Sequence, residues 1–99
     1  MTSRIDQLRQ LCSVILSTPV EGAYLFGSWQ EKVHPNDFDI LLVYDLERCS
    51  IPEILSLKRK IREVAPAIFG IPAHVVMLTT AEERQVKFIA ANNCVLLDC

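Results

Sequence analysis

Two apolar runs decide the fold of this chain: residues 23–28, AYLFGS, and residues 37–45, DFDILLVYD. The first run ends in a Gly-Ser pair, and the second begins with two aspartates, Asp37 and Asp39, separated by one residue. Because side chains alternate between the two faces of a strand, both carboxylates are expected to project to the same side. Adjacent carboxylates repel each other unless a cation lies between them, and a divalent metal is the usual one. The pattern therefore indicates a metal site beside a turn whose backbone N–H groups and hydroxyl suit phosphate oxygens.

Length, composition and charge limit the class of protein. The chain has 99 residues, 51% of them hydrophobic, and a formal net charge of −2. This length predicts a single domain over residues 1–99. Because so small a domain cannot bury so much apolar surface alone, we expect a protein partner or a homo-oligomer formed through an apolar face. The negative charge disfavours non-specific nucleic-acid binding, which needs a basic excess.

The sequence also bears on location and redox state. Its apolar runs are shorter than a membrane span, and its beginning, MTSRIDQLRQ, lacks a signal-peptide pattern, so we expect a cytoplasmic protein without membrane contact. No CxxC or Cys/His motif is present, which disfavours a zinc site. A disulfide framework is not expected in a chain with this much apolar core. Reduced thiols are predicted for all the cysteines: Cys12, Cys49, Cys94 and Cys99.

Apolar runs bounded by turn residues predict a small sheet. Strands are expected over residues 22–26, 38–44 and 73–79, with a short edge strand over 95–97. A short connection joins the first two strands, which favours their antiparallel pairing. Residues 38–44 are apolar on both faces. One face of the sheet should therefore be covered by helices, and the other should be open or covered by a partner.

Two helices are predicted from apolar spacing and capping residues. The first runs over about residues 4–17 and is capped by Thr2 or Ser3. The second opens with a capping box of Ser50 and Glu53. Its apolar residues at helical spacing should form a buried stripe: Ile54, Leu57, Ile61, Val64 and Ile68.

A third helix is expected to open with a capping box of Thr80 and Glu83 and to end near Asn92. The element order is then α-β-β-α-β-α-(β). This element order predicts an α+β fold, with a small mixed sheet of three to four strands and helices on one face. The polar segment from Trp29 to Asn36 is predicted as a loop.

The motif LFGS, followed after eight residues by DFDILLVYD, resembles the signature of the minimal nucleotidyltransferase domains of the DNA polymerase β-like superfamily. In that signature an apolar strand ends in Gly-Ser, and Asp-x-Asp opens the next strand. The resemblance covers nearly the whole chain, because the helix order, the length and the segment IPAHVVMLTTAEE also fit. It implies the nucleotidyltransferase fold.

The resemblance also implies a reaction and its residues. A nucleoside monophosphate would move from ATP or another nucleoside triphosphate to a protein or RNA hydroxyl. AMP is the group expected first. Asp37 and Asp39 would be catalytic by binding Mg²⁺ or Mn²⁺, which neutralises the charge developing on the phosphates. Gly27 and Ser28 would bind the nucleotide phosphates, with Lys32 as a nearby cation.

Two departures from the family pattern bear on activity. The resemblance places a third carboxylate near the start of the third strand, where this chain has His74. An imidazole is a poor magnesium ligand but suits manganese or zinc, and it could also act as the base for an acceptor hydroxyl. The arginines that often follow Gly-Ser are missing too, and only Lys32 and His34 are left there.

Two functions therefore stay open. The first is the nucleotidyltransferase, with Asp37, Asp39 and His74 as its catalytic residues. The second is a catalytically degenerate domain that acts as an antitoxin-like binding module for a helical HEPN-type partner, a role that the family resemblance also implies. Antibiotic modification is disfavoured, because enzymes of that kind usually carry an additional substrate-binding domain.

Two less specific features have ordinary explanations as well. The basic cluster at residues 58–62 is expected to be an exposed helix face. Trp29 follows the Gly-Ser motif in a polar stretch, and its indole could stack on a base or lie in an interface.

Overall fold

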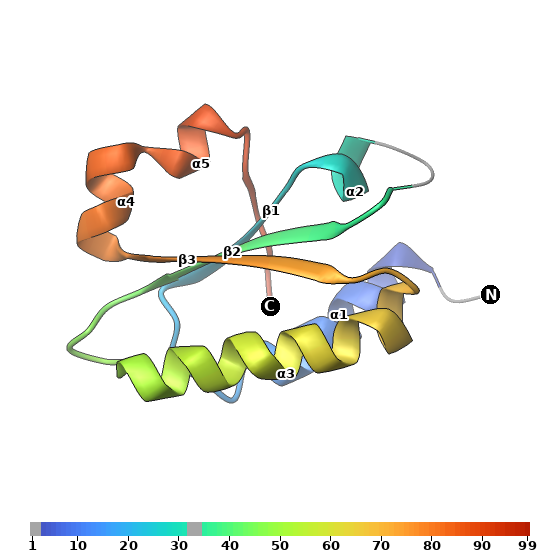
Figure 1. Cartoon of the computed structure of the whole chain (residues 1–99), viewed down its shortest axis with the longest axis horizontal. Coiled ribbons are helices and arrows are strands. Elements are labelled where there is room, and N and C mark those ends of the chain that lie inside the picture. The colour runs from blue at the N-terminus through green and yellow to red at the C-terminus, as the bar shows by residue number, and fades with distance from the viewer. Residues whose placement is uncertain (1–2, 32–34) are drawn as a thin grey trace.

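A four-stranded mixed sheet crosses the molecule in the computed structural model, which describes residues 3–31 and 35–99. Its strands lie in the order β3-β2-β1-β4 (Figure 1). β2 pairs antiparallel with β1 and parallel with β3, and β4 pairs antiparallel with β1. The antiparallel pairing of the first two strands and the short edge strand are confirmed. The strand bounds are β1 Gly22–Phe26, β2 Phe38–Tyr44, β3 Ala73–Thr79 and β4 Val95–Leu96.

Helices lie on both sides of this sheet. Figure 1 shows α1 and α3 together below it, and α4 and α5 on the opposite side. The expectation of helices on one face only is therefore wrong. The helix bounds are α1 Arg4–Ile15, α2 Ser28–Glu31, α3 Ile51–Phe69, α4 Thr80–Val86 and α5 Phe88–Ala91.

The main core lies between the sheet and the pair of helices α1 and α3. Ile40 and Leu42 of β2 are fully buried there with Leu11 of α1. The stripe predicted for α3 is confirmed at Ile54, Leu57 and Ile61, whereas Val64 and Ile68 are only partly buried and Ala65 is fully buried. Each fully buried Leu or Ile side chain stabilises the fold by about 1.5–3 kcal/mol.

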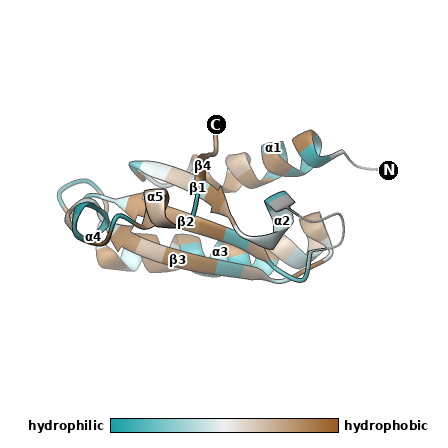
Figure 2. Cartoon of the chain, turned by 90° about the horizontal axis from the view of Figure 1, so that it is seen from above, coloured by the Kyte–Doolittle hydropathy of each residue, from teal (hydrophilic) through white to brown (hydrophobic). Residues whose placement is uncertain are grey.

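The second sheet face is apolar and is covered by the chain itself. Leu41 and Val43, which point away from the main core, are 0% and 5% exposed. The ring of Phe88 in α5 packs edge-on against Phe26 of β1 at 5.1 Å between centroids. Apolar residues run along β2 and β3 beside these helices in Figure 2. This face therefore does not need a partner to bury β2, which corrects the expected open face.

Capping residues fix where the long helices begin. The Ser3 hydroxyl accepts a hydrogen bond from the Asp6 N–H, and Ser50 with Glu53 forms the predicted capping box. The box predicted for the third helix is shifted by one residue. Thr79 keeps an extended backbone at the end of β3 and pairs with Glu82.

The predicted third helix is also divided. Lys87 adopts a left-handed backbone, with φ 50° and ψ 47°, which ends α4 and precedes α5. α5 ends at Ala91 with Asn92 as its C-cap, which agrees with the predicted end near Asn92. The bend at Lys87 lets the α4–α5 segment turn back over the sheet (Figure 1).

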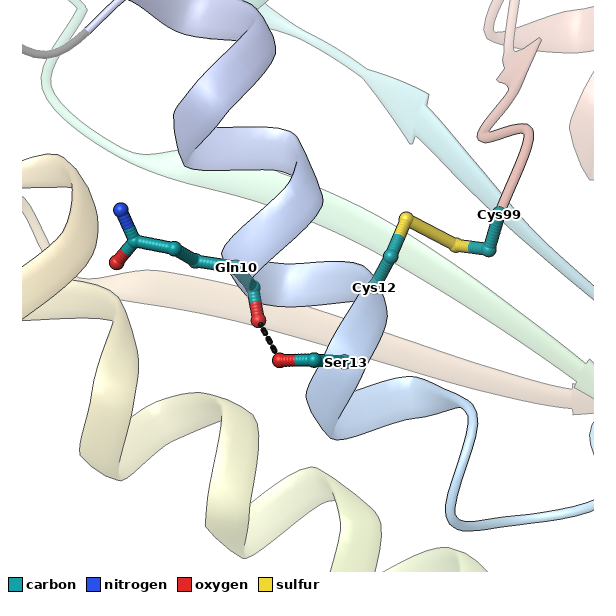
Figure 3. The surroundings of a disulfide bond; sticks show 4 residues. All are labelled: Gln10, Cys12, Ser13 and Cys99. Atoms are coloured by element: carbon teal, nitrogen blue, oxygen red, sulfur yellow. Dashed lines mark hydrogen bonds between the residues drawn. A yellow bond between two sulfur atoms is a disulfide. The ribbon is translucent and has the colours of Figure 1, made fainter.

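One pair of cysteines is bonded, so the prediction of reduced thiols is wrong for it. Cys12 of α1 and Cys99 form a disulfide with their Cα atoms 5.4 Å apart (Figure 3). The bond fixes the segment after β4 to α1 and closes a loop across 87 residues of sequence. Cys49 and Cys94 are free thiols, and the pKa of each is raised by burial and then by a nearby carboxylate, Glu53 or Glu83.

Among the residues that the structure describes, no helix is both long and apolar enough to cross a membrane.

Candidate functional site

The candidate site lies at the end of the sheet where β1 ends and β2 and β3 begin. In the antiparallel β1–β2 pair Phe26 stands opposite Asp39, and in the parallel β2–β3 pair Asp39 stands opposite His74. The Gly-Ser turn follows directly after Phe26. Three segments that are far apart in the sequence are thus brought together by the strand register alone.

Asp39 is the centre of this arrangement. Its side chain is 16% exposed, and Oδ1 lies 3.2 Å from Nδ1 of His74, whose side chain is 66% exposed. The other carboxylate oxygen, Oδ2, lies against the backbone of Gly27. The carboxylate is therefore held between the imidazole on one neighbouring strand and the turn that ends the other.

Gly27 is required for two independent reasons. Its φ is +77°, in the left-handed region that side chains with a Cβ rarely adopt. A Cβ at this position would also collide with Oδ2 of Asp39 and come within 3.0 Å of its Cγ. The predicted turn residue is thus also the residue that leaves space for the Asp39 carboxylate.

Ser28 connects the turn with the start of the aspartate motif. Its Oγ donates a hydrogen bond to the backbone carbonyl of Asp37 at 3.4 Å. The following turn is held by Gln30, whose Nε2 donates to the Leu25 carbonyl at 2.9 Å. These bonds hold the Gly-Ser turn close to the loop that carries Asp37.

Asp37 differs from Asp39 in its surroundings. It is exposed and precedes the first residue of β2, so the alternation of strand side chains does not fix the direction of its carboxylate. Within the described part of the chain, this carboxylate has no hydrogen-bond or ion-pair partner. The structure therefore brings Asp39 and His74 together, with Asp37 beside them on the adjoining loop.

Lys32, predicted to meet the phosphate charge, lies outside the described residues, as does His34.

Trp29 belongs to the core, so its indole is not available to stack on a base or to lie in an interface. Its side chain is 7% exposed and packs edge-on against Phe38 and Phe69, at 5.1 and 5.6 Å between ring centroids. The Arg4 guanidinium lies 4.5 Å from the indole ring and donates to the Trp29 carbonyl. The short helix α2 was predicted as a loop, and it is this turn that directs the indole inward.

The side chains near Asp39 provide few ligands for a cation. Among the described residues, no group of three or more His, Cys, Asp or Glu side chains converges in a way that could hold a metal ion. Asp39 and His74 form a converging pair, with one carboxylate and one imidazole 3.2 Å apart. This pair offers ligands of the right kind for a divalent cation, with further ligands to come from Asp37, water or a bound nucleotide.

Comparisons with known proteins add no identification. No protein-family model matches the sequence, and no curated protein is detectably similar to it. Function is therefore inferred from the residues and their geometry.

Proposed function

We propose that this chain is a nucleotidyltransferase-like domain that binds ATP, or another nucleoside triphosphate, with a divalent cation. In this proposal the nucleoside monophosphate passes to a hydroxyl of a protein or an RNA. The observation that supports it best is the position of the Asp39 carboxylate, held between the bare Cα of Gly27 and the imidazole of His74. A partly buried carboxylate beside a glycine turn at a strand end is the arrangement that the family resemblance implies.

The residues of the site suggest separate tasks. Asp39 would hold the cation, and the exposed Asp37 carboxylate would supply a second ligand. The absence of a side chain at Gly27 lets the Asp39 carboxylate lie against the turn, and the backbone N–H groups of that Gly-Ser turn would be the donors to phosphate oxygens. Bound Mg²⁺ or Mn²⁺ would supply charge neutralisation during in-line attack on the phosphate.

Isothermal titration of the protein with ATP and Mg²⁺ or Mn²⁺ tests the proposal. The wild type is expected to release or absorb heat with a saturable isotherm, and the double variant Asp37→Asn with Asp39→Asn is expected to give none. The matched control removes two carboxylates elsewhere, Glu47→Gln with Asp98→Asn, and keeps the wild-type isotherm. A flat wild-type titration, or equal heats from both double variants, would contradict nucleotide binding at this site.

A second candidate is a degenerate domain that acts as an antitoxin-like binding module for a helical HEPN-type partner. A groove of about 510 Å³ supports it, because α1, β1 and the edge strand β4 border this groove and its walls include the exposed side chains of Ile5, Val95 and Leu96. This groove is an apolar surface at the sheet edge, whereas the sequence predicted an open apolar sheet face.

Co-expression with a helical protein encoded beside this chain tests the second candidate. A stable complex that is lost in the variant Val95→Asp with Leu96→Asp, and retained in Glu47→Gln, is the expected result. A monodisperse monomer that never co-purifies with such a protein would remove this candidate.

A further inference from the structure

His74 and Asp39 face each other from neighbouring parallel strands. They are register partners, and the imidazole Nδ1 lies 3.2 Å from Oδ1 of the carboxylate. The imidazole is largely exposed, whereas the carboxylate is mostly buried and lies against Gly27 on its other side. One donor is therefore accessible and the other is fixed, and both belong to strands rather than to loops.

The separation of the two donor atoms matches that of neighbouring ligands on one metal ion. Ligands about 2.1 Å from an ion are about 3.0 Å apart at octahedral angles and about 3.4 Å apart at tetrahedral angles. The observed 3.2 Å lies between these values. An ion can therefore bind both atoms with little movement of either strand.

The chemical nature of the pair selects among ions. Magnesium demands oxygen ligands, whereas an imidazole nitrogen suits manganese, zinc and other first-row transition metals. Replacing an oxygen ligand by a nitrogen ligand therefore lowers the affinity of the site for Mg²⁺ more than its affinity for Mn²⁺. The Asp37 loop lies next to the pair, because the Ser28 hydroxyl bonds to the Asp37 carbonyl while Gly27 touches Asp39.

We propose that Asp39 and His74 together bind a divalent transition-metal ion, so that the site prefers Mn²⁺ to Mg²⁺. His74 is then a ligand through Nδ1 rather than a base for the acceptor hydroxyl. The role of the ion, which would be to bind the nucleotide phosphates, rests on the proposed function. The binding of the ion does not need that function.

Titration calorimetry of the metal-free protein with MnCl₂, and separately with MgCl₂, tests this ion preference without nucleotide. The wild type is expected to bind Mn²⁺ at least about tenfold more tightly than Mg²⁺. His74→Ala is expected to lose about tenfold or more in Mn²⁺ affinity, and His74→Asp to shift the preference toward Mg²⁺. The control Glu47→Gln keeps both wild-type affinities.

Two results would overturn the inference. One is an unchanged Mn²⁺ affinity in His74→Ala, which would make the His74–Asp39 contact a hydrogen bond without a metal role. The other is a wild type that binds both ions equally. Circular dichroism and thermal melts of each variant check folding, which is expected to hold because His74 is exposed.

Repeating the titrations with ATP separates this inference from the proposed function. Mn²⁺ binding that depends on His74, without any ATP binding, supports the ion site and contradicts the nucleotidyltransferase. ATP binding with Mg²⁺ that is indifferent to His74 contradicts the ion preference and leaves the proposed function in place.

Discussion

The two faces of β2 are both mostly apolar in sequence, but they lie in different environments. On one face Phe38, Ile40 and Leu42 are buried without interruption against the main core. On the other, Leu41 and Val43 are buried, but the first position is the carboxylate of Asp39. A strand can thus be apolar on both faces and still carry a polar site at one end.

The arrangement of the second layer explains where that site lies. α5 reaches β1 through the contact between Phe88 and Phe26, directly across from Asp39. On the β3 side, His74 remains exposed. The second sheet face is therefore covered at Leu41 and Val43, which follow Asp39 along β2. It is open next to Asp39 on the β3 side, where a ligand has access.

The largest effect is expected from the uninterrupted face. Phe38 is fully buried and its ring stacks on Phe69 at 4.1 Å, so Phe38→Ala should lower the free energy of unfolding by about 3–5 kcal/mol. Asp39→Asn on the opposite face should lower it by less than about 1 kcal/mol, because its partner His74 is exposed. Urea unfolding measures both, and similar losses would contradict the difference between the faces.

The disulfide fastens α1 over the main core, and its loss should have the next largest effect. Cys99→Ser is expected to lower the free energy of unfolding by about 2–4 kcal/mol, because the bond closes a long loop. Thermal melts with and without a dithiol reductant measure this loss in the wild type, and Cys94→Ser serves as the control. Equal melting temperatures under both conditions would show that α1 does not depend on the bond.

Two glycines separate backbone strain from the site itself. Gly27 and Gly70 have nearly the same φ, +77° and +73°, but a Cβ at Gly70 would meet no atom within 4 Å. Gly70→Ala should lose about 1–2 kcal/mol of stability through left-handed strain, and Gly27→Ala should lose more, because its Cβ also collides with Asp39. Only Gly27→Ala should weaken ATP binding, by about tenfold or more, because it displaces Asp39. If calorimetry finds the same ATP affinity in both variants, Gly27 has no specific role in ATP binding.

The smallest effect is expected at the cap of α4, the helix that covers the second face. Thr79→Ala removes the hydroxyl that accepts from the Glu82 N–H and should cost about 0.5–2 kcal/mol, whereas Ser17→Ala in the turn after α1 should cost less. Chemical unfolding of both variants measures the difference. An unchanged free energy of unfolding in Thr79→Ala would mean that Thr79 does not cap α4.

The same cap predicts a pH dependence. Hydrogen bonds from Thr79 lower the pKa of Glu82, so its carboxylate form favours the folded state. This contribution is present above the unfolded-state pKa of the group and is lost as the pH falls through its folded-state value. Glu82→Gln should flatten that part of the stability profile in acid, and an identical profile in wild type and variant would contradict it.

Much of the fold follows from local sequence patterns. The bounds of β1, β2 and β3 match the predicted 22–26, 38–44 and 73–79, because turn residues limit each apolar run. The position of α5, the disulfide and the inward turn of Trp29 do not follow from such patterns. Each depends on which distant segment lies nearby, and no residue spacing encodes that.

The candidate site divides in the same way. The Gly-Ser and Asp-x-Asp motifs mark Gly27 and Asp39 directly. The family resemblance assigns His74 to the same site as Asp39. Residue spacing alone does not reveal their contact, because it depends on the parallel pairing of β2 with β3 in a single register. Asp37 was grouped with Asp39 by alternation, but β2 begins only at Phe38.

The most direct test of the central claim is a crystal structure of the protein with ATP and Mn²⁺, examined at the manganese absorption edge. We expect an anomalous peak within about 2.0–2.3 Å of both a carboxylate oxygen of Asp39 and the His74 imidazole. The triphosphate should lie beside that peak along the Gly27-Ser28 turn. A manganese peak without Asp39 and His74 as ligands, or ATP bound in the groove between α1 and β4, would contradict a metal-dependent nucleotide site at Asp39 and His74.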